Sequence, residues 1–228
     1  MTTLSVVIPA YNEEDGIQAV MDRVLAIRPA LAEAGFADLE LIVVDDCSSD
    51  QTAALVAATP GARLIQHGCN GGYGAALKTG FTSARHDWVF YTDGDNQFDL
   101  DEIRSLLPLR RDCEIVSAYR IRRCDPFIRR VNEAIFNAVI RVLFGLRLRD
   151  VDCAFKLYRA SIFESMELQS EGAMIDVEIL AGAARRGARI AQVGVHHYPR
   201  TAGRPTGGNL SVIARAVREL FRLRARLR

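Results

Sequence analysis

The sequence predicts an α/β protein in which a mostly parallel sheet is flanked by helices. Apolar runs rich in valine and isoleucine at residues 4–10 and 39–46 are typical of strands that are buried on both faces of a parallel sheet. Between them, residues 13–35 carry apolar side chains at helical spacing and end at Gly35, which predicts a strand, helix, strand unit. Repetition of this unit favours a doubly wound sheet whose ligands bind beyond the carboxyl ends of its strands.

The elements that follow continue this alternation. We expect a capped helix at 48–59, a short strand at 62–67, a helix after a glycine-rich loop at 72–84, and strands at 88–93 and 113–119. Three polar loops, PAYNEE, DDCSSD and DGDNQ, then fall on one edge of the sheet. No internal repeat or low-complexity linker divides the 228 residues, which indicates one domain with a basic C-terminal portion.

The composition is that of an ordinary globular protein, with 49% hydrophobic and 25% charged residues. No segment approaches the roughly 20 apolar residues that cross a bilayer, and the N-terminus lacks the basic region of a secretory signal. We therefore expect a cytoplasmic protein. The five cysteines are scattered without a C-x-x-C pair, which indicates reduced thiols rather than disulfides or a zinc site.

The net charge of +1 hides a strong polarity along the chain. Residues 1–102 contain 5 Lys and Arg against 16 Asp and Glu, whereas residues 103–228 contain 24 against 12. We expect the acidic half to hold a cation and the basic half to meet anions, such as phospholipid, a phosphorylated substrate or nucleic acid.

Two segments of the basic half predict amphipathic helices. Residues 127–146 are expected either to pack deeply or to lie in a bilayer interface, because they form an apolar helix with one narrow polar stripe. That stripe consists of Arg130, Glu133, Asn137 and Arg141. Residues 211–228 carry six arginines against one glutamate, which favours an anionic membrane surface. The alternative for this tail is a solvated helix that packs on its own domain.

The DGD sequence predicts a metal site. Asp93 and Asp95 flank Gly94 directly after a predicted strand, so their carboxylates can converge on one cation. Oxygen ligands of this kind suit Mg²⁺ or Mn²⁺, which complete their shell with substrate phosphates and water. A calcium-binding EF-hand loop is excluded because Phe98 stands where glycine is required and Arg104 where glutamate is required. A nucleotide diphosphate could therefore lie across the three loops.

Four ordered motifs resemble the N-terminal motifs of family 2 glycosyltransferases, which have the GT-A fold. They are SVVIPAYNEE, LIVVDDCSSDQT, NGGYGAALKTGF and YTDGDNQFDLDEI. Three later segments, VSAYR, GLRLRDVDCAFKLYR and HHYPRTAGRPTGGN, are similar to those of dolichol-phosphate mannosyltransferase and other polyprenyl-phosphate glycosyltransferases. The resemblance implies a GT-A domain at 1–210, with a nucleotide-sugar half at 1–120 and an acceptor half at 121–210. A basic amphipathic helix at 211–228 would follow it.

The resemblance implies roles for residues on the donor side. Asp93, Asp95 and Gln97 match the segment that holds the metal and the diphosphate. Either Asp45 or Asp46 would contact the base or the ribose. The first loop would contribute the rest of the nucleotide pocket, which consists of Pro9, Tyr11, Asn12 and Glu13.

The resemblance also assigns arginines to phosphates. Arg120 matches an arginine that follows the fifth strand, and Arg130 is expected to meet the lipid phosphate. Arg200 matches an arginine that contacts the donor diphosphate. Thr206 stands where relatives often carry a lysine, so Arg204 is expected to supply that charge.

Further carboxylates lie in the acceptor half. Asp150 and Asp152 join Asp93 and Asp95 as the catalytic candidates, either orienting the acceptor or serving as a general base. The alternative for this pair is a turn at a helix end, neutralised by neighbouring arginines. Asp176 and Glu178 precede another predicted helix, where capping is the expected role. Ala154 replaces a glycine that many relatives carry in the acceptor motif, which bears on the geometry of that loop.

The expected reaction is metal-dependent transfer of a hexose, with inversion, from GDP-mannose or UDP-glucose to a polyprenyl phosphate. A monophosphate has a second pKa of about 6, so the acceptor oxygen needs little help from a base at neutral pH. The implied partners are the nucleotide sugar, the lipid phosphate and the cytoplasmic face of the membrane. A membrane-spanning partner or a second copy of the chain is also compatible, and nucleic acid is not implied.

Three other functions compete with this one. A glycosyltransferase that acts on a sugar hydroxyl would need a well-placed carboxylate base and would have less use for basic amphipathic helices. A sugar nucleotidyltransferase would need a glycine-rich loop after the first strand, where this chain has PAYNEE. A module that only binds nucleotide sugar would tolerate loss of Asp95 or Gln97.

Overall fold

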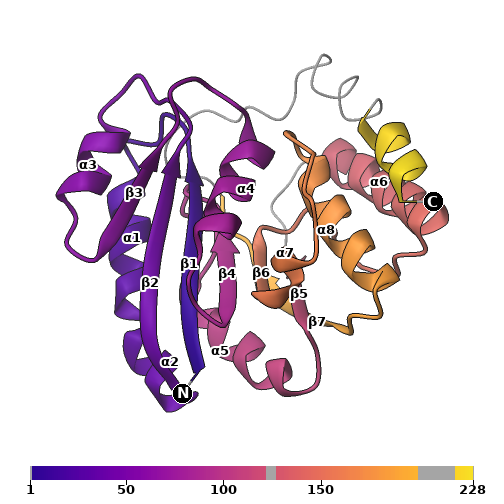
Figure 1. The fold of residues 1–228 in the computed structure, drawn as a ribbon, viewed down its shortest axis with the longest axis horizontal. Coiled ribbons are helices and arrows are strands. Elements are labelled where there is room, and N and C mark those ends of the chain that lie inside the picture. Colours follow the sequence, from indigo (N-terminus) through magenta and orange to yellow (C-terminus); the bar gives the residue numbers. More distant parts are fainter. Residues whose placement is uncertain (1, 122–126, 200–218, 228) are drawn as a thin grey trace.

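A seven-stranded sheet runs through the centre of the protein, with the strand order β3-β2-β1-β4-β6-β5-β7 (Figure 1). The structure, a computed structural model, describes residues 2–121, 127–199 and 219–227, and the side chains of residues 127–132 lie outside this description. The strands are β1 (Thr2–Ala10), β2 (Phe36–Asp45), β3 (Ala62–Gln66), β4 (Trp88–Thr92), β5 (Ile115–Ile121), β6 (Phe155–Arg159) and β7 (Ile190–His196).

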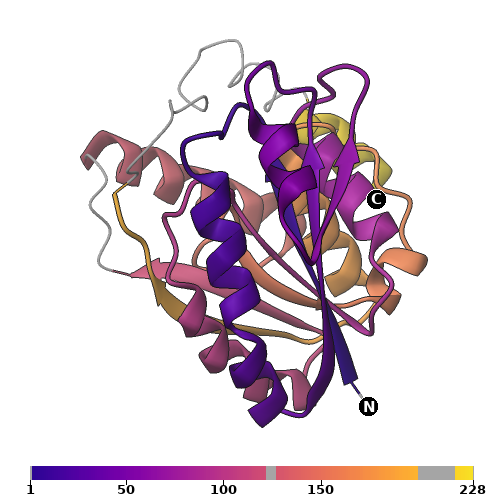
Figure 2. The ribbon, with the colours of Figure 1, turned by 90° about the vertical axis from the view of Figure 1, so that its left-hand side faces the viewer.

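Helices cover both faces of this sheet (Figures 1 and 2). Those that follow β1 and β2 lie on one face and those that follow β3 lie on the other, as right-handed crossovers require. The helices are α1 (Ile17–Ala26), α2 (Arg28–Glu33), α3 (Thr52–Ala58), α4 (Tyr73–Ser83), α5 (Ile103–Leu106), α6 (Phe127–Phe144), α7 (Ser161–Glu164) and α8 (Met174–Arg185). Short 3₁₀ turns, η1 (Leu100–Glu102) and η2 (Leu107–Arg111), flank α5, and residues 219–226 are also helical.

The sheet is mostly parallel, as predicted. β1 pairs in parallel with β2 and β4, β2 with β3, and β5 with β7. β6 is the exception, because it runs antiparallel to both β4 and β5. In this pairing Tyr91 lies opposite Lys156, and Thr92 lies opposite Phe155. The end of β4 and the beginning of β6 therefore meet at the same edge.

The segment at 13–35 differs from the single helix that the sequence predicts. α1 ends at Ala26 and α2 begins at Arg28, with Pro29 in the first turn of α2. Proline has no backbone N–H and its ring clashes with the preceding turn, so it is tolerated at a helix start but not in a helix interior. The prediction of one continuous helix was wrong at this point.

α8 also differs from the prediction, which placed Asp176 and Glu178 before a helix. Both residues lie inside α8 and both are buried. Their carboxylates bind other elements, so the expectation that they cap the helix was wrong. Buried carboxylates require partners, and those partners come from β6 and from the C-terminal helix.

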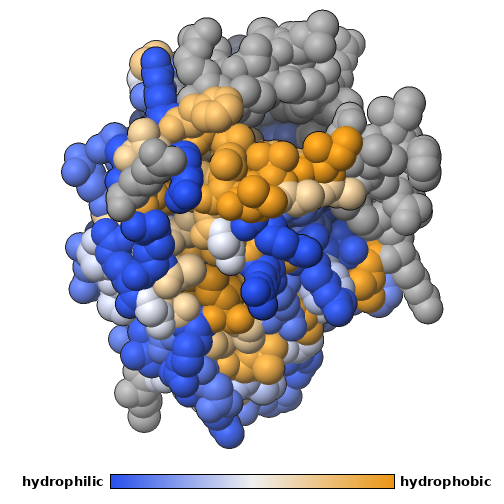
Figure 3. All heavy atoms as spheres, turned by 90° about the vertical axis from the view of Figure 1, so that its right-hand side faces the viewer, coloured by the Kyte–Doolittle hydropathy of each residue, from blue (hydrophilic) through white to orange (hydrophobic). Residues whose placement is uncertain are grey.

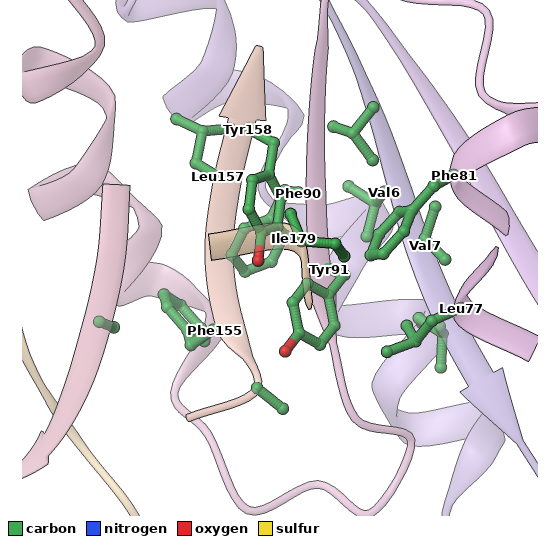
Figure 4. Close-up of a cluster of buried hydrophobic side chains, with 14 of the residues drawn as sticks. Val6, Val7, Leu77, Phe81, Phe90, Tyr91, Phe155, Leu157, Tyr158 and Ile179 are labelled. Atoms are coloured by element: carbon green, nitrogen blue, oxygen red, sulfur yellow. The ribbon is translucent and has the colours of Figure 1, made fainter. Parts of the chain in front are cut away.

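Aromatic side chains fill the core between α4, β4 and β6 (Figure 4). The Phe81 ring stacks on Phe163 with centroids 4.5 Å apart and meets Tyr91 edge-on at 5.6 Å. Such pairs add to the free energy gained from burying the rings. This packing fixes β4, and with it the loop that begins at Asp93.

Two expectations about the whole chain agree with the described residues. The four cysteines in the described ranges carry free thiols. None of the helices in these ranges is both long and apolar enough to span a bilayer.

Gly80 brings α4 into close contact with the sheet, which gives a stability prediction. A Cβ at this position would lie 2.3 Å from Cγ1 of the fully buried Val7. We expect Gly80→Ala to lower the free energy of unfolding by about 1–3 kcal/mol, because β1 and α4 must separate to admit the methyl group. Gly68→Ala is the control, since a Cβ there meets nothing within 4 Å. Equal thermal unfolding midpoints for the two variants would contradict this packing.

Candidate active site

The carboxyl ends of β1, β2 and β4 bring the three predicted polar loops to one edge of the sheet (Figure 1). Hydrogen bonds tie the first loop to the second: the backbone N–H of Asn12 donates to Oγ of Ser48 at 2.9 Å, and that of Ser49 donates to Oδ1 of Asn12 at 2.8 Å. The other predicted pocket residues of the first loop differ in exposure: Pro9 is buried, Glu13 is half-buried and Tyr11 is exposed.

Both carboxylate oxygens of Asp46 accept hydrogen bonds from within the protein. Its Oδ1 accepts the backbone N–H of Gly71 at 2.9 Å, its Oδ2 accepts that of Gly72 at 2.7 Å, and Oδ1 also lies 2.7 Å from Nδ1 of His67. These contacts fix the glycine-rich loop that precedes α4. Asp46 therefore has a structural role at this edge of the sheet, where it holds the glycine-rich loop in place.

Asp45, at the end of β2, uses only one of its two carboxylate oxygens as a hydrogen-bond acceptor. Its Oδ2 accepts hydrogen bonds from the backbone N–H of Ser48 and from the side chain of Gln66, both at 3.2 Å. Its Oδ1 is buried and has no hydrogen-bond partner among the described residues. A buried acceptor of this kind is costly unless a ligand supplies a donor. Asp45 therefore keeps an acceptor that no described residue uses, whereas both oxygens of Asp46 accept hydrogen bonds.

Asp93 and Asp95 project from the end of β4. Gly94 packs close to β1, where a Cβ would make an ordinary van der Waals contact with the carbonyl oxygen of Pro9 at 3.4 Å. The hydroxyl of Tyr73, at the start of α4, donates to Oδ1 of Asp93 at 3.0 Å. Burial, together with repulsion from Asp95, raises the pKa of Asp93 to about 7. The sequence analysis missed Tyr73, although it stands in the NGGYGAALKTGF motif.

A divalent cation fits the pair Asp93 and Asp95. Two neighbouring carboxylates repel each other, and a cation between them removes that repulsion. Within the described residues, no group of three or more His, Cys, Asp or Glu side chains is placed to hold a metal. Mg²⁺ and Mn²⁺ sites that use one or two carboxylates take their other ligands from phosphates and water.

Gln97 connects this loop to the end of β7. Its side-chain Nε2 donates to the carbonyl oxygen of Tyr198 at 2.8 Å, and the backbone N–H of Tyr198 donates to the Gln97 carbonyl at 2.8 Å. The amide that was expected to help hold the metal therefore also positions the chain that leads to residue 200. Arg200 and Arg204 themselves lie outside the described residues, as does the side chain of Arg130.

Arg120 and Asp150 form a buried ion pair. Nε of Arg120 donates to Oδ2 of Asp150 at 2.7 Å, and one terminal nitrogen donates to Oδ1 at 2.8 Å. A third contact joins Arg120 to Glu133 of α6 at 3.3 Å. Burial would lower the pKa of Arg120, but the two carboxylates together raise it. Asp150 is thus neutralised by Arg120 rather than by arginines next to it in sequence.

Asp152 is the carboxylate of the second pair that faces outward. Part of the residue is exposed to solvent. Partial desolvation by the surrounding chain and repulsion from Asp176 raise the pKa of Asp152 to about 7. Its neighbours in the segment 150–154 are buried. We name residues 150–154 the acceptor loop.

Lys156 and Asp176 are buried behind the acceptor loop and were not among the predicted site residues. Nζ of Lys156 lies 2.7 Å from Oδ1 of Asp176, and the Tyr91 hydroxyl donates to the same oxygen at 2.5 Å. In FKLYR the lysine alternates with apolar residues, a pattern that ordinarily indicates an exposed side chain. Nothing in the sequence pattern indicates that this lysine is fully buried.

α6 turns part of its polar stripe toward the site and exposes apolar side chains. Glu133 contacts Arg120, and Oδ1 of Asn137 accepts the backbone N–H of Val151 at 3.0 Å. Arg141, in contrast, is exposed. Figure 3 shows apolar atoms gathered on the face that carries α6. We name its exposed members the α6 stripe: Ile135 (57% exposed), Val139 (37%) and Val142 (82%).

The described part of the C-terminal helix packs on the domain. Leu220 and Leu223 are buried, and Arg226 donates to Oε1 of Glu178 at 2.6 Å. Arg226 was expected on a face that meets a membrane. For residues 219–227 the structure instead agrees with the alternative, a helix packed on its own domain.

Comparison with known proteins identifies relatives over most of the chain. The family model for Glycosyl transferase family 2 matches residues 5–166. The undecaprenyl-phosphate 4-deoxy-4-formamido-L-arabinose transferase of Edwardsiella ictaluri is 30% identical over 92% of this chain and 64% of its own length. The dodecaprenyl-phosphate galacturonate synthase of Rhizobium johnstonii is 31% identical over 88% of this chain and 60% of its own length. This chain therefore spans less than two thirds of either relative.

A solved structure shares the fold. Glucosyl-3-phosphoglycerate synthase from Mycobacterium tuberculosis, in complex with Mn²⁺, uridine diphosphate and phosphoglyceric acid, superposes with a TM-score of 0.73 at 25% identity. The match covers 98% of this chain and 78% of that one. It extends beyond the family model, through α8 and β7.

The ion pair of Arg120 and Asp150 gives a prediction. We expect Asp150→Asn to lower the free energy of unfolding by about 3 kcal/mol or more, because it leaves the Arg120 guanidinium buried without its main counter-charge. Glu133→Gln is the control, and it should cost less because that contact is longer and single. Urea denaturation of both variants measures the difference. A larger loss for Glu133→Gln would contradict the assignment of Asp150 as the main partner.

Proposed function

Because the chain belongs to glycosyl transferase family 2, we propose that it transfers a hexose from a nucleotide sugar to the phosphate of a polyprenyl lipid, with a divalent metal at Asp93 and Asp95. The mostly parallel sheet with helices on both faces is the GT-A fold that the sequence predicts. The observation that carries the proposal is the meeting of two loops at one edge. One loop holds the paired carboxylates, and the other exposes Asp152.

The names of the relatives support a polyprenyl phosphate as acceptor. Both curated relatives are named for undecaprenyl or dodecaprenyl phosphate. The sugars in those names, a formamido-arabinose and galacturonate, extend the donors to be tested beyond GDP-mannose and UDP-glucose. The Mn²⁺ and uridine diphosphate in the structural relative support a metal-bound nucleotide donor.

Each part of the edge has a task in this proposal. Asp45 would accept a hydrogen bond from the base or the ribose through its unpartnered buried oxygen. Asp93, oriented by Tyr73, and Asp95 would hold the metal, with Gln97 completing that segment. The metal, when bound, supplies Lewis-acid stabilisation of the departing diphosphate.

The acceptor half would meet the second anion. We assign Arg130, Arg200 and Arg204 to the lipid and donor phosphates, whereas the Arg120 guanidinium is already held by Asp150 and Glu133. Asp152 would orient the acceptor for in-line attack on the anomeric carbon, which inverts its configuration. Because its pKa is raised to about 7, Asp152 would also suit a hydroxyl acceptor, which needs a base. Transfer to a sugar hydroxyl is therefore the second candidate, and an acceptor panel separates the two.

We also propose that the protein works at the cytoplasmic face of the membrane as a peripheral protein. The α6 stripe supports this, because it exposes three apolar side chains on the helix whose other side contacts Arg120. A lipid phosphate held near Arg120 would place its chain beside this helix. A membrane-spanning partner or a second copy of the chain is compatible with the same surface.

The direct test of function combines the protein, Mn²⁺ or Mg²⁺, a panel of nucleotide sugars and a short polyprenyl phosphate. We expect a lipid-linked sugar from one donor, and we expect Asp95→Asn to lower kcat by at least about 10²-fold, because the metal loses a ligand. Asp99→Asn is the matched control in the same acidic stretch, since Asp99 pairs with Arg23 at 3.0 Å. Transfer only to a sugar hydroxyl, or equal losses in both variants, would overturn the proposal.

Membrane binding is tested on the α6 stripe. We expect Val142→Glu to reduce sedimentation of the protein with phosphatidylglycerol vesicles by about 5-fold or more, because a charge replaces an apolar contact. Ala54→Glu, which adds the same charge to an exposed position of α3, should bind like the wild type. If both variants bind equally well, the α6 stripe does not face the lipid.

A further inference from the structure

The acceptor loop is anchored at every position around Asp152. Asp150 is held by the guanidinium of Arg120, and the backbone N–H of Val151 donates to Asn137 at 3.0 Å. On the other side of Asp152, the carbonyl oxygen of Cys153 accepts a hydrogen bond from Nζ of Lys156. Three neighbours are thus fixed by three different elements, and Asp152 is the exposed residue between them.

Lys156 is the buried member of this set. Its side chain is fully buried, and its Nζ has three partners: the Cys153 carbonyl, the Tyr91 hydroxyl at 2.9 Å and Asp176 at 2.7 Å. An ammonium group has three donors, so each is used. With all three donors used inside the protein, Lys156 has none left for a substrate, which argues against direct catalysis or binding by this residue.

The register of β4 and β6 decides what this ammonium connects. Lys156 lies directly opposite Tyr91, which is two residues before Asp93. Toward the site, β6 leads back to Cys153 and Asp152, and β4 leads forward to Asp93. One buried cation therefore bonds to Tyr91, in the strand that leads to Asp93, and to the backbone of the acceptor loop.

We propose that Lys156 is a positioning residue that fixes the acceptor loop, and Asp152 in particular, relative to Asp93. The catalytic part of this inference rests on the proposed sugar transfer. An ion pair with Asp176 alone would not require the bond to Cys153, and a buried ion pair is by itself weak evidence for stability. The bond to the loop gives the lysine a function that an apolar residue of similar volume does not supply.

The test uses the double variant Lys156→Met/Asp176→Asn. The single change Lys156→Met leaves the Asp176 carboxylate buried without a counter-charge, which strongly destabilises a fold, whereas the double change removes both charges. We expect hydrogen exchange at the amides of residues 151–153 to be at least about tenfold faster, because the loop loses an anchor. We expect kcat to fall about 10²-fold, as misplacement near 1 Å can cause, while the KM for the nucleotide sugar stays within about twofold.

The control is Arg63→Met/Glu40→Gln. It removes another ion pair of the same sheet, 2.9 Å long, which joins β2 to β3 away from the carboxyl ends of the strands. Both double variants are compared at equal intervals below their unfolding midpoints. Unchanged exchange at 151–153, or a fall in kcat that the control matches, would overturn the proposal. Faster exchange at 151–153 without any transfer by the wild type would uphold the positioning role and reject the proposed reaction.

Discussion

The antiparallel pairing of β4 with β6 is the constraint on which the site depends. Because β4 ends where β6 begins, the loop after Thr92 and the loop before Phe155 leave the sheet side by side. A parallel strand in the place of β6 would begin at the opposite edge and carry its preceding loop there. The reversal of one strand in a mostly parallel sheet is therefore what brings Asp93 and Asp152 to one edge.

Charge pairing follows from this arrangement. Three buried carboxylates that follow β5 in the chain each have a cation: Asp150 has Arg120, Asp176 has Lys156 and Glu178 has Arg226. Asp93 differs, because burial and repulsion from Asp95 both oppose its charge. Under the proposed function, a divalent cation would neutralise Asp93 and Asp95 at the edge of the sheet where ligands of such folds bind.

Sequence patterns predicted the strands and loops of residues 1–120 well, because buried parallel strands are continuous apolar runs and their ends are short polar loops. They failed where tertiary contacts override local pattern. Lys156 alternates with apolar residues, which predicts an exposed side chain. Its burial depends on Asp176, which lies twenty residues later in another element. The sequence predicted the polar stripe of α6 but not which way it faces. That direction depends on contacts with other elements, because Glu133 contacts Arg120 and Asn137 accepts a hydrogen bond from Val151. The separate roles of Asp45 and Asp46 also required the structure, since only it shows which carboxylate the glycine-rich loop occupies.

A distance measurement from a bound metal tests most directly whether the two loops share one site. Mn²⁺, added with a nucleoside diphosphate, broadens the NMR signals of amides near it, whereas Mg²⁺ does not. We expect Mn²⁺ to broaden the amides of residues 93–97 and of residues 151–153 in the same titration, because both loops border one site. Broadening of 93–97 with the signals of 151–153 unchanged would show that the metal and the acceptor loop do not share a site.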